Sequence, residues 1–230
     1  MELLPAIHLI DGVSSNVYLI DEPTGLTVID TGMPKSAPAI MQFIRRMRRS
    51  PMDVRRIILT HQHFDHVGGA AALADETGAE VLAHRLDAPA IDGSSARELP
   101  SGFVGFLFRQ VLIPRLQPAR VAGYLADGQT LPILEQFGGL RVVETPGHTS
   151  GHLSLYVPGY KLLFAGDAYR HEKDTLRPSP RLFNTDTAQA QKSLRLLAEN
   201  YELNASLPGH GTPILKNAGD HLKRLADTQV

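Results

Sequence analysis

The sequence contains no cysteine and no tryptophan among its 230 residues. The absence of cysteine excludes a disulfide-stapled fold, a zinc finger and any enzyme that uses a thiolate nucleophile. Neither sign of charge is in excess, because 23 Lys and Arg stand against 24 Asp and Glu, which gives a formal net charge of −1. This balance provides no general attraction to polyanions. We therefore expect no nucleic-acid partner.

Long hydrophobic runs are also absent. The longest apolar-rich patch, Phe103 to Leu116, is interrupted by Arg109, Gln110 and Pro114 and is shorter than the roughly 20 residues that cross a bilayer. The first residues, MELLPAIHLIDG, include no basic stretch of the kind that opens a secretory signal. We therefore expect a cytoplasmic protein without a membrane span.

Apolar residues make up 43% of the chain, which is enough to build a core. Short β-rich runs alternate with segments whose apolar residues recur every three or four positions. The pattern predicts strands at 3–10, 16–20, 26–29, 57–59, 80–83, 140–144, 152–157 and 161–165, and helices at 37–47, 68–76, 187–201 and 218–226. Strands followed by helices, twice over, indicate an α/β fold with two β-layers between outer helices. We expect one domain over residues 1–230. The segment 85–120 is a candidate lid or dimerisation surface, with packing against the chain's own core as the alternative, so that a homodimer is a candidate assembly.

Three of the ten histidines lie in one hexapeptide, His61-Gln62-His63-Phe64-Asp65-His66, directly after a strand of the buried type. Residues two apart in an extended segment point the same way, so His61 and His63 can offer their imidazoles to one metal ion. Asp65 and His66 follow where the strand turns and can face a second ion. Imidazole and carboxylate ligands suit Zn²⁺, and also Fe, Mn or Co.

Three further candidate ligands each follow a strand-like run and stand beside a glycine: His148, Asp167 and His210. Alone, each is a weak signal, since glycine, aspartate and histidine are common in turns. In this order, the motifs resemble those of the metallo-β-lactamase-fold hydrolase superfamily, in its glyoxalase II and lactonase-like branch. The matching stretches are Asp30–Gly32, Thr60–Gly69, Pro146–His152, Gly166–Asp167 and Gly209–Gly211.

The resemblance implies a four-layer αββα sandwich of two mixed sheets, with a dinuclear metal site at one edge of the sheets. It also implies a role for each candidate ligand: His61, His63 and His148 on the first ion, Asp65, His66 and His210 on the second, and Asp167 between them. Zn²⁺ is the expected metal, and Fe or Mn are the alternatives.

Such a site predicts a hydrolase. Metal binding lowers the pKa of water from 15.7 to roughly 7, and the resulting hydroxide would attack the carbonyl of a small ester, thioester or lactone. Asp65 is a candidate proton shuttle, and Tyr169, two residues past Asp167, is a candidate donor to the leaving group. Asp30 is a candidate acceptor for the second ring N–H of a ligand histidine, and His152 is a candidate for a similar role.

Two alternatives remain open at this point. Some members of the superfamily are phosphodiesterases or nucleases, and arginines cluster at positions 45, 46, 48, 49, 55 and 56. The other alternative is a non-catalytic metal-binding module. Enzymes of the glyoxalase II type also carry a C-terminal helical region that grips glutathione, whereas about 20 residues follow His210 here. We therefore expect a small-molecule substrate and a build different from that type.

Overall fold

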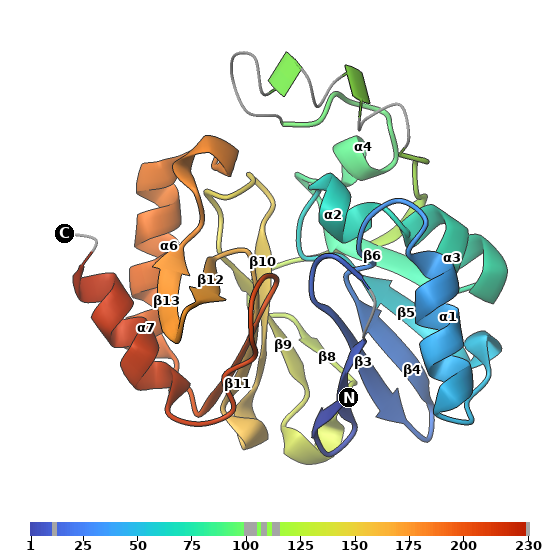
Figure 1. The fold of residues 1–230 in the computed structure, drawn as a ribbon, viewed down its shortest axis with the longest axis horizontal. Coiled ribbons are helices and arrows are strands. Elements are labelled where there is room, and N and C mark those ends of the chain that lie inside the picture. The colour runs from blue at the N-terminus through green and yellow to red at the C-terminus, as the bar shows by residue number, and fades with distance from the viewer. Residues whose placement is uncertain (11–12, 99–104, 107–109, 112–115, 229–230) are drawn as a thin grey trace. The chain divides into compact units, whose positions relative to one another are not determined.

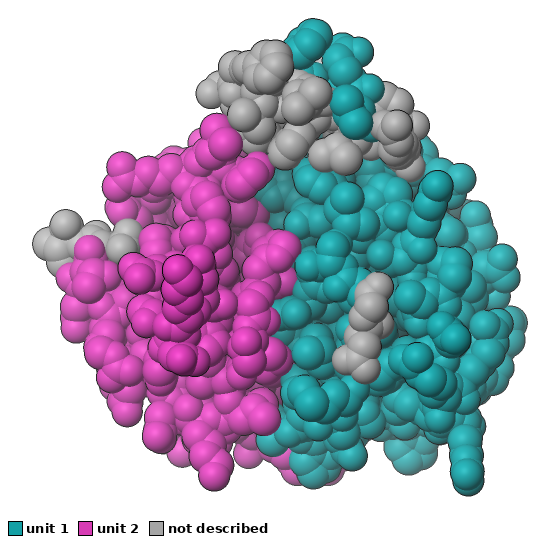
Figure 2. Space-filling view, viewed as in Figure 1, with its two compact units in different colours: residues 1–124 teal, residues 125–230 magenta. Residues whose placement is uncertain are grey.

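The computed structural model describes residues 1–10, 13–98, 105–106, 110–111 and 116–228. The chain forms two compact units, unit 1 over residues 1–124 and unit 2 over residues 125–230 (Figure 2). Each unit has a sheet and helices of its own and is described by itself. The single domain over residues 1–230 stays a prediction.

Unit 1 is built on a seven-stranded sheet with the order β1-β2-β3-β4-β5-β6-β7 (Figure 1). Strands β1 to β4 form an antiparallel meander, whereas β4, β5 and β6 run parallel. Parallel neighbours need a crossover connection, and helices occupy these connections. The elements are β1 (Glu2–Leu4), β2 (Ile7–Ile10), β3 (Val17–Glu22), β4 (Gly25–Ile29), α1 (Ala37–Arg46), β5 (Val54–Ile58), α2 (Phe64–Val67), α3 (Ala70–Thr77), β6 (Glu80–His84), α4 (Ala88–Ile91) and β7 (Val121–Leu125).

Helix α1 shows how the sequence pattern builds this unit. Ile40 and Ile44, four residues apart, lie on one face of the helix and are fully buried. They belong to the same apolar cluster as Val28 of β4 and Ile57 of β5, so α1 covers one face of the sheet. Two arginines stand in its last turn, where a positive charge is favourable.

Unit 2 contains a five-stranded sheet with the order β14-β11-β10-β9-β8 and a separate hairpin of β12 and β13 (Figure 1). Strands β11 and β14 are parallel and are connected through a helix, and the other pairs of the larger sheet are antiparallel. The elements are β8 (Thr130–Leu131), β9 (Leu140–Glu144), β10 (Leu153–Val157), β11 (Leu162–Gly166), β12 (Tyr169–Glu172), β13 (Thr175–Pro178), α6 (Thr187–Asn200), β14 (Ala205–Pro208) and α7 (Ala218–Asp227).

Alternation along the strands decides which face of the unit 2 sheet the helices cover. Tyr156 of β10 and Leu163 of β11 are cross-strand partners on one face. Both lie in one apolar cluster with Leu197 of α6 and Leu222 of α7. Helices α6 and α7 therefore pack side by side against this face, and Asp186 starts α6 by accepting a hydrogen bond from Gln189 N.

The predicted fold class, mixed sheets flanked by helices, is confirmed. The predicted turn at residues 64–67 forms the short helix α2, and α4, β7, β8, β14 and the hairpin of β12 and β13 occupy stretches for which the sequence predicts no element. No helix among the described residues combines the length and the hydropathy needed to cross a membrane.

The predicted insertion at 85–120 falls partly outside the described residues, which exclude 99–104, 107–109 and 112–115. Helix α4 lies within this segment, and Phe106 and Val111 expose 59% and 39% of their surface. A lid or a dimer surface here stays a prediction.

Gly68 provides a test of the packing behind α2. A Cβ atom at this position would lie 2.3 Å from the backbone nitrogen of Pro34 and 2.4 Å from the carbonyl carbon of Met33. Because backbone atoms cannot move aside cheaply, we expect Gly68→Ala to lower the free energy of unfolding by about 1–3 kcal/mol or more, as measured by chemical denaturation.

The matched control is Gly78→Ala, at which a Cβ would meet nothing within 4 Å. There the cost arises only from the positive φ of 73° and should be about 1 kcal/mol. Equal unfolding free energies for the two variants would contradict the close approach of α2 to residues 33–34.

Candidate metal centre

The first group of predicted ligands gathers at the carboxyl end of β5 in unit 1. The ring centroids of His61 and His63 lie 4.8 Å apart, and those of His61 and His66 lie 4.1 Å apart. His61 and His66 are fully buried, whereas His63 and Asp65 are partly exposed. The extended segment 61–63 and the short helix α2 therefore bring three imidazoles and one carboxylate together, as the spacing predicts.

Asp30, at the end of β4, fixes how His66 is oriented. Nδ1 of His66 donates to Oδ2 of Asp30 at 2.8 Å, because a carboxylate can only accept. This proton on Nδ1 leaves the lone pair on Nε2, which is the ring atom that a metal needs. The sequence prediction that Asp30 accepts a ring N–H of a candidate ligand is confirmed. Asp30 itself has a φ of 59°, in the left-handed region that aspartate tolerates better than most residues.

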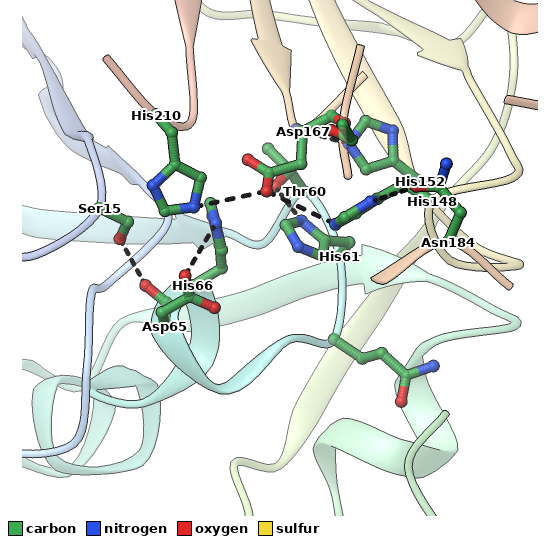
Figure 3. A network of polar contacts seen from close by, with 12 residues as sticks. Ser15, Thr60, His61, Asp65, His66, His148, His152, Asp167, Asn184 and His210 are labelled. Carbon is green, nitrogen blue, oxygen red and sulfur yellow. Dashed lines mark hydrogen bonds and ion pairs between the residues drawn. The ribbon is translucent and has the colours of Figure 1, made fainter. Parts of the chain in front are cut away.

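Thr60 extends the influence of Asp30 to His61. The Thr60 hydroxyl donates to Oδ2 of Asp30 at 2.8 Å, and its oxygen lies 3.0 Å from Nδ1 of His61 (Figure 3). Since the single hydroxyl proton points to the carboxylate, the Thr60 oxygen accepts from His61 Nδ1–H. Asp30 thus sets the tautomer of His66 directly and that of His61 through Thr60. Thr60 directly precedes the His61–His66 hexapeptide, but its residue type and position alone did not indicate this role.

Two side-chain hydroxyls hold helix α2 in place by donating to the backbone carbonyls of Asp65 and His66. The hydroxyl of Ser15 donates to the backbone carbonyl of Asp65 (Figure 3), and Thr31 donates from its hydroxyl, at 2.8 Å, to the carbonyl of His66. Oδ2 of Asp65 lies 3.9 Å from Nε2 of His66. These two candidate ligand atoms therefore face the same region of unit 1.

The second group of ligands lies at one edge of the unit 2 sheet. Strands β9, β11 and β14 run in the same direction, and His148, Asp167 and His210 follow their respective carboxyl ends. Nε2 of His148 lies 3.5 Å and Nε2 of His210 lies 3.4 Å from Oδ2 of Asp167. Two imidazoles from different strand ends therefore converge on one carboxylate oxygen (Figure 3).

Two polar side chains orient these ligands from behind. Nδ1 of His148 lies 2.9 Å from Oδ1 of Asn184, so the ring donates its Nδ1 proton there and keeps its lone pair on Nε2. His152 accepts from the backbone N–H of Asp167 at 2.8 Å and therefore holds its own proton on Nδ1, which faces Thr145. His152 thus positions Asp167. The sequence gives no indication that Asn184 orients His148.

Tyr169 occupies a place that does not suit the predicted role of proton donor. Its side chain is fully buried in the apolar cluster beneath α6 and α7, and its hydroxyl lies 2.8 Å from Oγ of Ser206. Burial raises the pKa of this phenol well above its usual value. A core position of this kind keeps the phenol proton away from a leaving group, so the structure does not favour Tyr169 as the proton donor.

The donor chemistry of both units fits a divalent metal. The candidate atoms are imidazole nitrogens and carboxylate oxygens. Among the described residues, sets of three histidines and aspartates have their ligand atoms within 4.8 Å of one another, close enough to hold a metal ion. This set matches Zn²⁺, Fe or Mn better than Ca²⁺ or Mg²⁺, which prefer oxygen ligands alone.

Comparison with known proteins places the chain in a family. Residues 10–210 match the metallo-beta-lactamase superfamily. A probable metallo-hydrolase of Bacillus subtilis, YflN, is 32% identical over 98% of this chain and 92% of its own length. A hydroxyacylglutathione hydrolase of Rhodobacter capsulatus is 29% identical over 73% of this chain, which spans 52% of that relative.

A solved structure shares the fold as well. A metallo-beta-lactamase family protein of Thermus thermophilus aligns with a TM-score of 0.78 at 23% identity, covering 99% of this chain and 80% of that one. The likeness at this identity concerns the fold alone, whereas the family match spans most of the sequence. This chain belongs to the metallo-beta-lactamase superfamily.

Proposed function

We propose that this chain is a metal-dependent hydrolase that cleaves a small ester, thioester or lactone with two divalent ions. One ion would be held by His61, His63 and His148, the other by Asp65, His66 and His210, and Asp167 would bind both. Zn²⁺ is the first choice, and Fe or Mn are the alternatives.

The observation that carries this proposal is the position of Asp167 Oδ2. Nε2 of His148 and Nε2 of His210, which the proposal assigns to different ions, lie 3.5 and 3.4 Å from this one oxygen. The two short distances to this one carboxylate support the proposal that Asp167 would bind both ions. The backbone N–H of Asp167, bound to His152, keeps the residue in that place.

Divalent ions held by these residues would supply a water molecule activated for nucleophilic attack at neutral pH and would polarise the carbonyl group. Asp30, Thr60 and Asn184 hold the imidazoles of His66, His61 and His148, respectively, with Nε2 presented and Nδ1 protonated. The Asp65 carboxyl, with 22% of its side chain exposed, can take up a proton from the attacking water on the oxygen that would not bind the ion and return it to the leaving group.

The relatives support an acyl substrate. By its name, the Rhodobacter relative hydrolyses an acylated glutathione, and the Bacillus relative is named as a metallo-hydrolase. Because the chain spans only about half of the Rhodobacter protein, we transfer the acyl class of substrate and not the glutathione group.

Metal dependence gives the first test of this function. We expect the purified chain to bind two divalent ions by elemental analysis and to hydrolyse at least one compound of a panel of acyl thioesters, nitrophenyl esters and lactones. Chelation should abolish the hydrolysis, and added Zn²⁺ or Mn²⁺ should restore it. His61→Ala should lower kcat at least 100-fold because one ion loses a ligand.

His221→Ala is the matched control for this substitution, since His221 lies on α7 and belongs to neither ligand group. It should leave metal content and turnover unchanged. Hydrolysis that survives His61→Ala or chelation would exclude the metal mechanism, and cleavage of bis-nitrophenyl phosphate alone would favour a phosphodiesterase.

Thr60 gives a second test, because the proposal relies on it to orient His61. Thr60→Val keeps the shape of the side chain but removes the oxygen that accepts from His61 Nδ1. We expect the affinity for one ion to fall about 10- to 100-fold, as measured by competition with a chromophoric chelator. Thr60→Ser restores the hydroxyl and should recover most of the affinity; equal losses in both variants would contradict this role.

A further inference from the structure

The two peptide groups that flank Gln62, which stands between two candidate ligands, are each held by a charged side chain. The backbone N–H of Gln62 donates to Oδ2 of Asp87 at 2.9 Å, and its carbonyl accepts from Nη1 of Arg97. The side-chain Oε1 of Gln62 accepts from the backbone N–H of Glu98 at 3.1 Å. Gln62 is almost completely buried, and its contact with Asp87 is buried as well, whereas the contacts with Arg97 and Glu98 are partly buried.

Asp87, which is buried, and Arg97, which is partly buried, place opposite charges on the two sides of Gln62. Asp87 is fully buried, and although it precedes α4, its side chain does not cap that helix. Burial lowers the pKa of Arg97 to about 10, while the charge of Asp87 opposes this effect, so the guanidinium stays charged at neutral pH. Removing the Asp87 carboxylate from water is costly, so stability alone does not explain a charged group at this position.

We infer that Asp87 and Arg97 are positioning residues that hold the His61-Gln62-His63 backbone in the direction needed for metal binding. This inference rests on the proposed function, in which His61 and His63 bind the same ion. Each of the two peptide groups that flank Gln62 is held at one atom, which restrains its rotation. These groups adjoin the Cα atoms of His61 and His63 and therefore set the directions of their Cα–Cβ bonds. Neither Asp87 nor Arg97 would touch the ion or the substrate.

This action differs from that of Asp30 and Thr60. Those residues determine which ring nitrogen of His61 and His66 carries the proton, whereas the pair of Asp87 and Arg97 acts on the backbone on either side of Gln62. His66 lies on α2 and is held separately by Asp30. Substitution of Asp87 or Arg97 should therefore lower the affinity for the ion that His61 and His63 would bind and leave the affinity for the other ion unchanged.

Cobalt titration of the full chain tests this expectation. We would compare the wild type with Asp87→Asn, which removes the charge, and with Arg97→Lys, which keeps the charge but loses the planar fork. The visible absorption of bound Co²⁺ and competition with a chelator report the two affinities. We expect one affinity to fall about 10- to 100-fold, with an altered absorption band, and the other to stay within about threefold.

The controls lie on the same segment. Asp92→Asn and Arg85→Lys change exposed residues of like charge and should titrate like the wild type. Circular dichroism and thermal unfolding of the metal-free chains show whether each variant folds, and Arg97→Lys decides the matter if Asp87→Asn does not fold.

Folded variants with wild-type cobalt affinities and spectra would overturn the inference, as would an equal loss of both ions together with lower stability of the metal-free chain. In those cases the wild type still binds two ions, and the proposed function stands. A wild-type chain that binds no cobalt would instead overturn the proposed function, and this inference with it.

Discussion

The buried carboxylate of Asp30 is the group on which the candidate ligands of unit 1 depend. It accepts from the backbone N–H and the hydroxyl of Thr60 and from Nδ1 of His66. A carboxylate without such partners would cost several kcal/mol to bury. Thr60, two residues after β5, and helix α2 must therefore pack against the end of β4, where Asp30 lies. The same closure gives His61 and His66 the tautomers that a metal requires.

Unit 2 orients its ligands with neutral groups instead. His148 donates to the amide of Asn184, and Asp167 is held through its backbone by His152. A carboxylate partner raises the basicity of an imidazole more than an amide does. The histidine held by Asp30 is thus a stronger electron donor than the one held by Asn184, and the two ions of the proposed centre would sit in different electronic surroundings.

The sequence by itself determined the seven candidate ligands, the supporting role of Asp30 and most of the helices and strands. These features are local. The spacing of His61, His63 and His66 follows from the geometry of an extended segment and a turn, and α1 is visible in apolar residues three and four positions apart. The family resemblance added the assignment of ligands from distant parts of the chain to the same ion. The spacing of residues within one segment cannot provide that assignment.

Only the tertiary structure identified the side chains other than Asp30 that support the ligands. Asn184 stands 36 residues from His148, and Asp87 and Arg97 stand 25 and 35 residues from Gln62. Tyr169 lies close to Asp167 in sequence, but its hydroxyl meets Ser206, 37 residues away, in the core. The physical reason is the same in each case: a polar group removed from water takes the partner that the packing brings to it, and neither periodicity nor residue type in the sequence identifies that partner.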